Sequence, residues 1–393
     1  MNISVITLLF CLIVLVEGRK VHRFRLQRRS HRHHKLPQPH LHLQFRNALR
    51  RKYGYTPLRT VNAVQVASES GKGAVLSEAL INSYDTNFFG LVSVGDQPFT
   101  VQFDSGSSDL WVPSSNCEFC IKKCGNKFFQ KSKSKSFRSS GVPFSITYGS
   151  GSVKGIVATD NVGFGDLKIL QQGIGLVNIS DSCSVFDGIA GLAFQQLSMT
   201  RSVPPFQQMI DQQLVEKPIF SFHLKSGSSD GGSMILGGSN SSLYYGPLTY
   251  TNVTEAKYWT FRMDGIEVHG KGSRRCDSGC KAIMDTGTSL IVGPVMDVLY
   301  LNQAIGAKHN ATYDLYTVDC DSIDQLPIMV FYIAGKEFFV KPQTYVIVYQ
   351  DFCFAGLIDM RGLDYWIIGD VFLRENYVEF DWARKRIGIA PAV

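Results

Sequence analysis

The chain has 393 residues, of which 44% are hydrophobic and 12% aromatic, and it carries a formal net charge of +7 at pH 7. That length and apolar content allow a large buried core and more than one lobe. The 36 glycines, 26 phenylalanines and 16 tyrosines favour strands joined by tight turns over a helical bundle.

Residues 1–18 predict a cleaved signal peptide. Residues 1–16 are apolar but too short to span a bilayer, and the small residue Gly18 follows just before a basic region. A buried N-terminal strand or a signal anchor is the alternative. No later stretch is apolar enough to cross a membrane, so we expect no stable membrane insertion. The expected destination is the secretory pathway, either endosomal or lysosomal, or secreted.

The next segment, residues 19–59, is strongly cationic. It holds 13 Lys and Arg, six of the nine His and no Asp or Glu. Removing those 13 bases and Glu17 leaves 27 bases against 32 acids, so a cationic arm precedes an anionic body. A nucleic-acid or heparin arm and a solvated tail are the alternatives. We favour a propeptide over residues 19–68 that inhibits the body and detaches at low pH, where body carboxylates become protonated and arm histidines become charged.

Cysteines and glycosylation sequons agree with an oxidising compartment. An even number of cysteines favours disulfides over zinc, although "CEFCIKKC" contains a C-x-x-C that keeps a metal site as the alternative. No histidine lies close in sequence to complete a zinc site, and we expect none. The eight cysteines after the signal are Cys117, Cys120, Cys124, Cys183, Cys276, Cys280, Cys320 and Cys353. The four candidate glycosylation sites are Asn178, Asn240, Asn252 and Asn310.

Two acidic motifs repeat along the chain. "FDSGSSDLWVPS" at residues 103–114 places Asp104 after an apolar run, and "AIMDTGTSLIVGP" at residues 282–294 places Asp285 in the same pattern. A second pair, "FDGIAGLAF" and "YWIIGDVFL", sets Gly191 and Gly369 after two apolar residues. The two motifs recur in the same order at offsets of 181 and 178 residues. This repeat predicts two related lobes, each contributing one aspartate.

The chemistry explains why two such motifs would meet. Two adjacent carboxylates cannot both ionise easily, so one can act as a base toward water while the other, protonated, donates to a substrate carbonyl. The glycine after each aspartate permits a tight turn. Nearby hydroxyl groups can bond the carboxylates or brace the two loops; they belong to Ser105, Ser107, Thr286 and Thr288. Neither a metal nor any other cofactor is needed.

With these motifs the chain resembles the pepsin family of aspartic proteases over almost its whole length. The resemblance implies Asp104 and Asp285 as the catalytic pair. "SITYGSGSVKGIVATD" resembles the hairpin that covers the substrate, and Trp111 matches the residue whose ring nitrogen supports its tyrosine. Supporting or substrate-binding roles are implied for Gly106, Ser107, Trp111, Tyr148, Gly149, Ser150, Gly287 and Thr288. "ALINSYDTNFFG" and "IGIAPAV" are most similar to cathepsin E, with cathepsin D and the nothepsins near.

The resemblance also implies the fold and three disulfides. The fold is mainly β and bilobal, with a few short helices and an active-site cleft between an N-terminal lobe at residues 69–250 and a C-terminal lobe at residues 251–393. The implied disulfides are Cys117–Cys124, Cys276–Cys280 and Cys320–Cys353, which leave Cys120 and Cys183 unassigned. Ser105 replaces the usual threonine, so looser packing is expected there. A monomer is favoured over a disulfide-linked dimer.

The expected function is an acid aspartic endopeptidase made as a zymogen. It would cleave proteins and peptides with apolar side chains around the cleaved bond and would bind no nucleic acid. The alternatives are a catalytically silent relative that binds peptides, and a heparin- or nucleic-acid-binding glycoprotein that keeps the basic arm.

Overall fold

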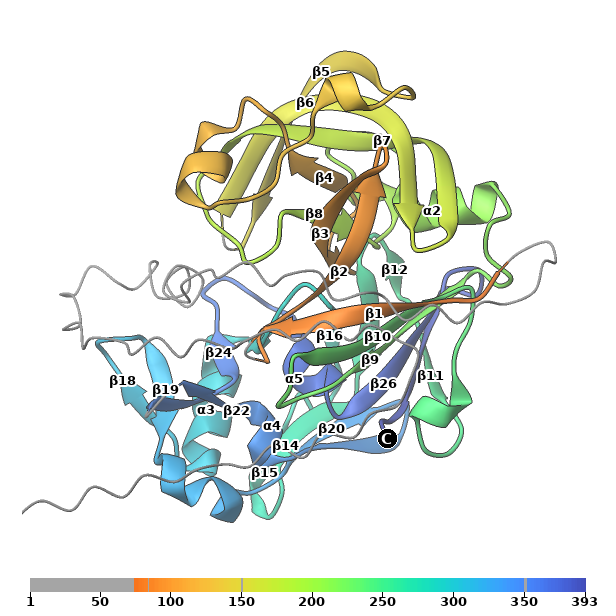
Figure 1. Cartoon of the computed structure of the whole chain (residues 1–393). Helices are drawn as coiled ribbons and strands as arrows, with labels where there is room; N and C mark the ends of the chain where they lie inside the picture. The colour runs from red at the N-terminus through yellow and green to blue at the C-terminus, as the bar shows by residue number, and fades with distance from the viewer. Residues whose placement is uncertain (1–73, 84, 150, 350–351) are drawn as a thin grey trace, which may run out of the picture. The chain divides into compact units, whose positions relative to one another are not determined.

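A computed structural model of the chain describes residues 74–83, 85–149, 151–349 and 352–393. The signal peptide expected at residues 1–18, the propeptide expected at 19–68 and Ser150 lie outside these residues. Strands dominate the described part of the chain, as expected for the mainly β fold (Figure 1). None of its helices is long and apolar enough to cross a membrane.

The largest sheet joins both ends of the described chain. Its thirteen strands run, in spatial order, β11 (Thr249–Asn252), β27 (Arg386–Pro391), β26 (Asn376–Asp381), β9 (Ile219–Leu224), β10 (Asp230–Leu236), β1 (Leu76–Ser83), β2 (Asn87–Val94), β3 (Gln97–Asp104), β8 (Gly188–Gly191), β4 (Leu110–Pro113), β7 (Leu167–Ser180), β6 (Gly151–Phe164) and β5 (Arg138–Tyr148). The sheet therefore continues across the lobe boundary predicted at residue 250, and that boundary stays a prediction.

Three smaller sheets are built from residues 255–368. The six-stranded sheet has the order β12 (Glu255–Ala256), β13 (Trp259–Met263), β16 (Cys280–Met284), β25 (Trp366–Ile368), β17 (Ile291–Gly293), β24 (Leu357–Asp359). One four-stranded sheet has the order β15 (Lys271–Arg275), β14 (Gly265–Val268), β20 (Met329–Ile333), β21 (Lys336–Val340). The other has the order β18 (Lys308–Asn310), β19 (Leu315–Val318), β23 (Phe352–Ala355), β22 (Val346–Tyr349).

Helices are short and connect the strands. The α-helices of the described residues are α2 (Pro205–Asp211), α3 (Val295–Ile305), α4 (Pro342–Tyr345) and α5 (Asp370–Leu373). Shorter helical turns are η1 (Phe119–Lys123), η2 (Lys131–Lys133), η3 (Gln195–Leu197), η4 (Ser241–Leu243) and η5 (Cys320–Gln325). α3 ends at Ile305 and is capped by Gly306, whose φ of 89° is the left-handed conformation common at helix C-termini.

The repeat predicted from the two aspartate motifs appears in the strand pairing. β3 pairs parallel with β8, β8 antiparallel with β4, and β4 parallel with β7. β16, β25, β17 and β24 follow the same parallel, antiparallel, parallel sequence. Each aspartate therefore lies at or just after the end of the first strand of an equivalent four-strand unit.

Hydrophobic packing holds the two units together. One buried cluster contains residues of both, including Phe103 and Trp366. Phe194, from the segment after β8, packs on Trp259 of β13 with ring centroids 4.7 Å apart. A second, smaller cluster lies beneath the β5–β6 hairpin and includes Trp111 and Phe144. The long strands β5, β6 and β7 run side by side above it (Figure 1).

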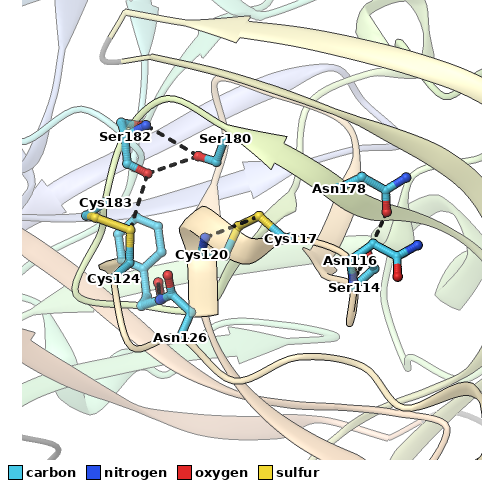
Figure 2. The surroundings of a disulfide bond; sticks show 11 residues. Ser114, Asn116, Cys117, Cys120, Cys124, Asn126, Asn178, Ser180, Ser182 and Cys183 are labelled. Atoms are coloured by element: carbon cyan, nitrogen blue, oxygen red, sulfur yellow. Dashed lines mark hydrogen bonds between the residues drawn. A yellow bond between two sulfur atoms is a disulfide. The ribbon is translucent and has the colours of Figure 1, made fainter. Parts of the chain in front are cut away.

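The disulfides correct one of the sequence predictions. Cys276–Cys280 and Cys320–Cys353 are present as expected. The expected Cys117–Cys124 pair is wrong: Cys117 bonds Cys120, and Cys124 bonds Cys183 (Figure 2). The helical turn η1 explains the difference. It brings the Cα atoms of Cys117 and Cys120 to 5.3 Å, and Cys124 at its end lies 5.2 Å from the Cα of Cys183.

The four predicted glycosylation sites lie at or near the surface. Asn240 and Asn252 are exposed, whereas Asn178 on β7 and Asn310 on β18 are half-buried. The side-chain oxygen of Asn178 accepts a hydrogen bond from Ser114 Oγ (2.6 Å; Figure 2). Their use as glycosylation sites stays a prediction.

Candidate active site

The two aspartate loops meet and hold each other through a reciprocal pair of hydrogen bonds. The backbone N–H of Ser105 donates to Thr286 Oγ1, and the backbone N–H of Thr286 donates to Ser105 Oγ, both at 2.9 Å. Each hydroxyl then donates to the opposite strand: Ser105 Oγ to Met284 O at 3.0 Å and Thr286 Oγ1 to Phe103 O at 2.7 Å. Both side chains are buried, so this clasp is shielded from water.

The clasp brings the carboxyl groups of Asp104 and Asp285 together. A Cβ atom at Gly106 would lie 2.6 Å from the Asp285 carboxyl group, and one at Gly287 would overlap the carboxyl group of Asp104. Each glycine is therefore required by the close approach of the opposite carboxyl group. The two carboxyl groups are therefore adjacent, and two adjacent carboxyl groups cannot both ionise easily.

Each carboxyl group has equivalent hydrogen-bond donors within its own loop. The backbone N–H of Gly106 donates to Asp104 Oδ1 (2.9 Å), and that of Gly287 donates to Asp285 Oδ1 (2.8 Å). The outer oxygens accept from hydroxyl groups, Asp104 Oδ2 from Ser107 (2.5 Å) and Asp285 Oδ2 from Thr288 (2.7 Å). The four predicted hydroxyls thus divide into two that bond carboxylates and two that clasp the loops.

Burial and charge both perturb Asp104, whose side chain is buried. Its pKa is raised well above the usual range, mainly because burial removes water from the charged form and then because Asp285 is adjacent. The donated bonds from Ser107 and Gly106 act in the opposite direction and lower the pKa. Because the charge on each carboxyl group acts on the other, their titration belongs to the pair.

The second repeated motif supports the loops from below. The backbone N–H of Leu192 donates to Asp104 O, and that of Asp285 donates to Ile368 O. A Cβ atom at Gly191 would lie 2.5 Å from the backbone of the first loop, and one at Gly369 would overlap Thr288 O in the second. The glycines noted in the sequence therefore allow each supporting strand to pack directly against an aspartate loop.

The β5–β6 hairpin brings Tyr148 to the pair. Trp111 Nε1 donates to the Tyr148 hydroxyl at 2.8 Å, which is the contact expected from the family resemblance. Burial raises the pKa of Tyr148 well above its usual value, and Asp104 adds to the shift, so the phenol stays protonated. Gly149 is exposed at the tip of the hairpin.

Sequence reasoning missed two sets of contacts at this site. Gln102 Nε2 donates to Gly287 O (3.4 Å), which links β3 to the second loop. Asp181 bonds Ser152 directly after the hairpin tip. Neither residue belongs to a repeated motif, so the sequence contained no signal for them. The described residues contain no cluster of His, Cys, Asp and Glu that could hold a metal ion.

Comparisons with known proteins identify the family. The family described as "Eukaryotic aspartyl protease" matches residues 87–392. Chymosin of Ovis aries is 40% identical over 336 residues, covering 84% of this chain and 87% of the relative. Cathepsin D of Gallus gallus is 37% identical over 333 residues, covering 80% and 83% of the two chains, respectively. Cathepsin E-B of Xenopus laevis is 37% identical over 350 residues, covering 85% and 86%.

These identities differ too little to assign the chain to one member, so the resemblance to cathepsin E stays a prediction. The match spans both aspartate loops and both copies of the repeat. The chain therefore belongs to the pepsin-like aspartic endopeptidases of the eukaryotic aspartyl protease family.

Proposed function

We propose that the chain is an acid-acting aspartic endopeptidase in which Asp104 and Asp285 form the catalytic pair. The observation that carries this proposal is the reciprocal clasp, which sets the two carboxyl groups side by side. One carboxylate takes a proton from a bound water while the protonated partner donates to the peptide carbonyl. The result is a tetrahedral diol that collapses to two peptides without an acyl-enzyme.

The hairpin supplies the second element of the proposed mechanism. Tyr148 lies beside the pair and is held by Trp111, so the hairpin is positioned to cover an extended peptide. Apolar side chains on both sides of the cleaved bond are the expected preference. Ser150, which the resemblance places beside the substrate, lies outside the described residues.

We further propose synthesis as a zymogen that enters the secretory pathway. The cationic segment at residues 19–59 opposes an anionic body and would inhibit it until acidification weakens their attraction. Four disulfides support an oxidising compartment, either endosomal or lysosomal, or extracellular. They use all eight cysteines of the described residues within one chain, which supports a monomer.

The test is acidification of the purified full chain with and without pepstatin, followed by mass spectrometry and a peptide-cleavage assay. We expect loss of the basic arm and pepstatin-sensitive cleavage. Asp104→Asn and Asp285→Asn should each abolish cleavage while the protein stays folded. Asp96→Asn, an exposed aspartate in the β2–β3 turn, is the matched control and should keep full activity.

Other outcomes would identify other functions. A folded chain that binds pepstatin but cleaves no peptide would be a silent peptide-binding relative. A chain that keeps its arm and stays inactive at every acidic pH would favour a polyanion-binding glycoprotein. Substantial activity in pure, folded Asp104→Asn would refute the catalytic pair.

A further inference from the structure

The tip end of the β5–β6 hairpin is tied to the segment that follows β7. Ser152 faces Thr147 across the hairpin, one residue pair away from Tyr148 and Gly151. The backbone N–H of Ser152 donates to Asp181 Oδ1 at 2.7 Å, and its hydroxyl donates to Asp181 Oδ2 at 2.8 Å. The backbone N–H of Asp181 returns a bond to Ser152 O at 3.3 Å. One aspartate therefore holds the hairpin strand by both its backbone and its side chain.

The carboxylate of Asp181 packs closely on the hairpin backbone. A Cβ atom at Gly151 would lie 2.5 Å from Asp181 Oδ1 and would also overlap Ser182 Oγ. Any residue larger than glycine would push this segment away from the hairpin. The contact therefore depends on a glycine directly beside the tip.

A disulfide holds Asp181 in place. Cys183, two residues further on, is bonded to Cys124 at the end of η1 (Figure 2). Around Asp181, the hydroxyl of Ser180 donates to the backbone oxygen of Ser182 at 2.9 Å and closes a tight turn (Figure 2). Residues 180–183 are thus bonded to the hairpin at one end and to η1 at the other.

The helical turn η1 is itself firmly anchored. Cys117 and Cys120 are buried and belong to the cluster that contains Trp111, the residue that donates to Tyr148. The Cys117–Cys120 bond holds the start of this turn, and Asn126 just after it donates to Phe186 O at 2.9 Å. The body of the hairpin packs on the Trp111 cluster through its own side chains, such as Phe144 and Val153, and β6 pairs with β7 as far as Val153 and Ser180. Nearer the tip, Tyr148 and Asp181 add two further contacts that lead back to this cluster.

We propose that residues 180–183 form a brace that positions the β5–β6 hairpin, and that Asp181 is a positioning residue for substrate binding. This inference rests on the proposed peptidase function. A braced hairpin needs little further ordering when a peptide binds beneath it, so the brace lowers the free-energy cost of binding. Because the bound substrate and the transition state benefit equally, the effect belongs in KM and not in kcat.

The first test is Asp181→Ala in the full chain, measured on a peptide substrate after acid treatment. We expect KM and the pepstatin dissociation constant to rise by about three- to tenfold, the loss expected for one or two hydrogen bonds, with kcat changed less than twofold. Asp181→Asn keeps one acceptor oxygen and should recover part of the loss. Asp211→Ala is the matched control, because Asp211 is also exposed and bonds Gln207 within α2.

The second test removes the disulfide. Cys124→Ser with Cys183→Ser should raise KM as Asp181→Ala does, and adding Asp181→Ala should cause little further change because the two act through one segment. Removing the Cys320–Cys353 bond in the same way is the control and should lower thermal stability without changing KM. If the Cys124 and Cys183 variant does not fold, the Asp181 series decides.

Hydrogen exchange separates failure of the brace from failure of the proposed function. In Asp181→Ala, the amides of residues 144–149 and 151–156 should exchange about five- to tenfold faster than in the wild type, with or without catalysis. Wild-type exchange together with wild-type KM in this variant would overturn the brace. A drop in kcat and thermal stability with unchanged KM would overturn the positioning role. A wild-type chain without pepstatin-sensitive cleavage would refute the peptidase function, and exchange alone would then decide whether the brace holds the hairpin.

Discussion

The buried Glu78 should make the free energy of unfolding fall as pH rises, which is the direction that fits the proposed acid-acting function. It lies on β1 opposite Met234, and only 4% of it is exposed. Burial raises the pKa of Glu78 from 4.5 to about 7, and the nearby Asp166 adds to the rise. A backbone hydrogen bond from Leu91 lowers the pKa but does not offset the burial. In the folded protein Glu78 is therefore protonated in acid.

The sign and size of the effect follow from this shift. Between pH 4.5 and 7 the folded protein keeps a proton on Glu78 that the unfolded chain has released, so stability falls as pH rises through this window. The full contribution is about 3 kcal/mol. Glu78→Gln keeps the shape of the side chain and removes the titration. The free energy of unfolding of the variant should match the wild type near pH 4 and exceed it by about 3 kcal/mol above pH 7.

Urea unfolding at pH values from 4 to 7.5 measures this difference. Both proteins should carry Asp104→Asn to prevent self-digestion. Glu118→Gln is the control, because the Glu118 side chain is 80% exposed and its replacement changes no buried group. A difference between Glu78→Gln and its parent that stays constant across the pH range would refute the reasoning.

Three further substitutions test the site and its supports. Ser105→Ala should lower the free energy of unfolding by about 1–3 kcal/mol in urea, because it leaves a buried N–H of the second loop unpaired, and Ser105→Thr should lose less. Trp111→Phe removes the hydrogen bond to Tyr148 and should reduce kcat/KM about fivefold without unfolding the protein, as steady-state kinetics and circular dichroism would show. Asp85→Ala removes the ion-pair partner of Arg374, whose side chain is 1% exposed, and leaves its guanidinium only the hydrogen bonds to Thr344 O and Ser226 Oγ. The loss should be about 3 kcal/mol in urea unfolding, and a smaller loss than for Ser105→Ala would contradict this ion-pair argument.

The aspartate pair could be predicted from the sequence because each copy of the repeat determines the local structure of one aspartate loop. Each copy specifies the same strand, turn and supporting strand, so two equivalent loops with matching hydroxyls can clasp each other. Ser105 shows that the clasp requires a hydroxyl group at this position and no more. It makes the same two hydrogen bonds as Thr286 without the extra methyl group. These hydrogen bonds need a hydroxyl group, and Ser105 supplies one.

The cysteine pairing could not be predicted from the sequence, because it depends on the backbone conformation of a segment in which several pairings are possible. Cys117, Cys120 and Cys124 lie within eight residues, so spacing alone excludes none of their pairings. The helical turn η1 brings Cys117 close to Cys120, so these two residues pair. Cys124 then pairs with Cys183, 59 residues away.

The hairpin brace depends on this same choice. A Cys117–Cys124 bond would close the loop on itself and leave Cys183 unattached beside Asp181. The observed pairing instead connects η1 to the segment that holds Ser152. The disulfide that the sequence did not predict, Cys124–Cys183, thus lies next to the contact between Asp181 and Ser152 that holds the hairpin. We expect this disulfide and this contact to be gained or lost together.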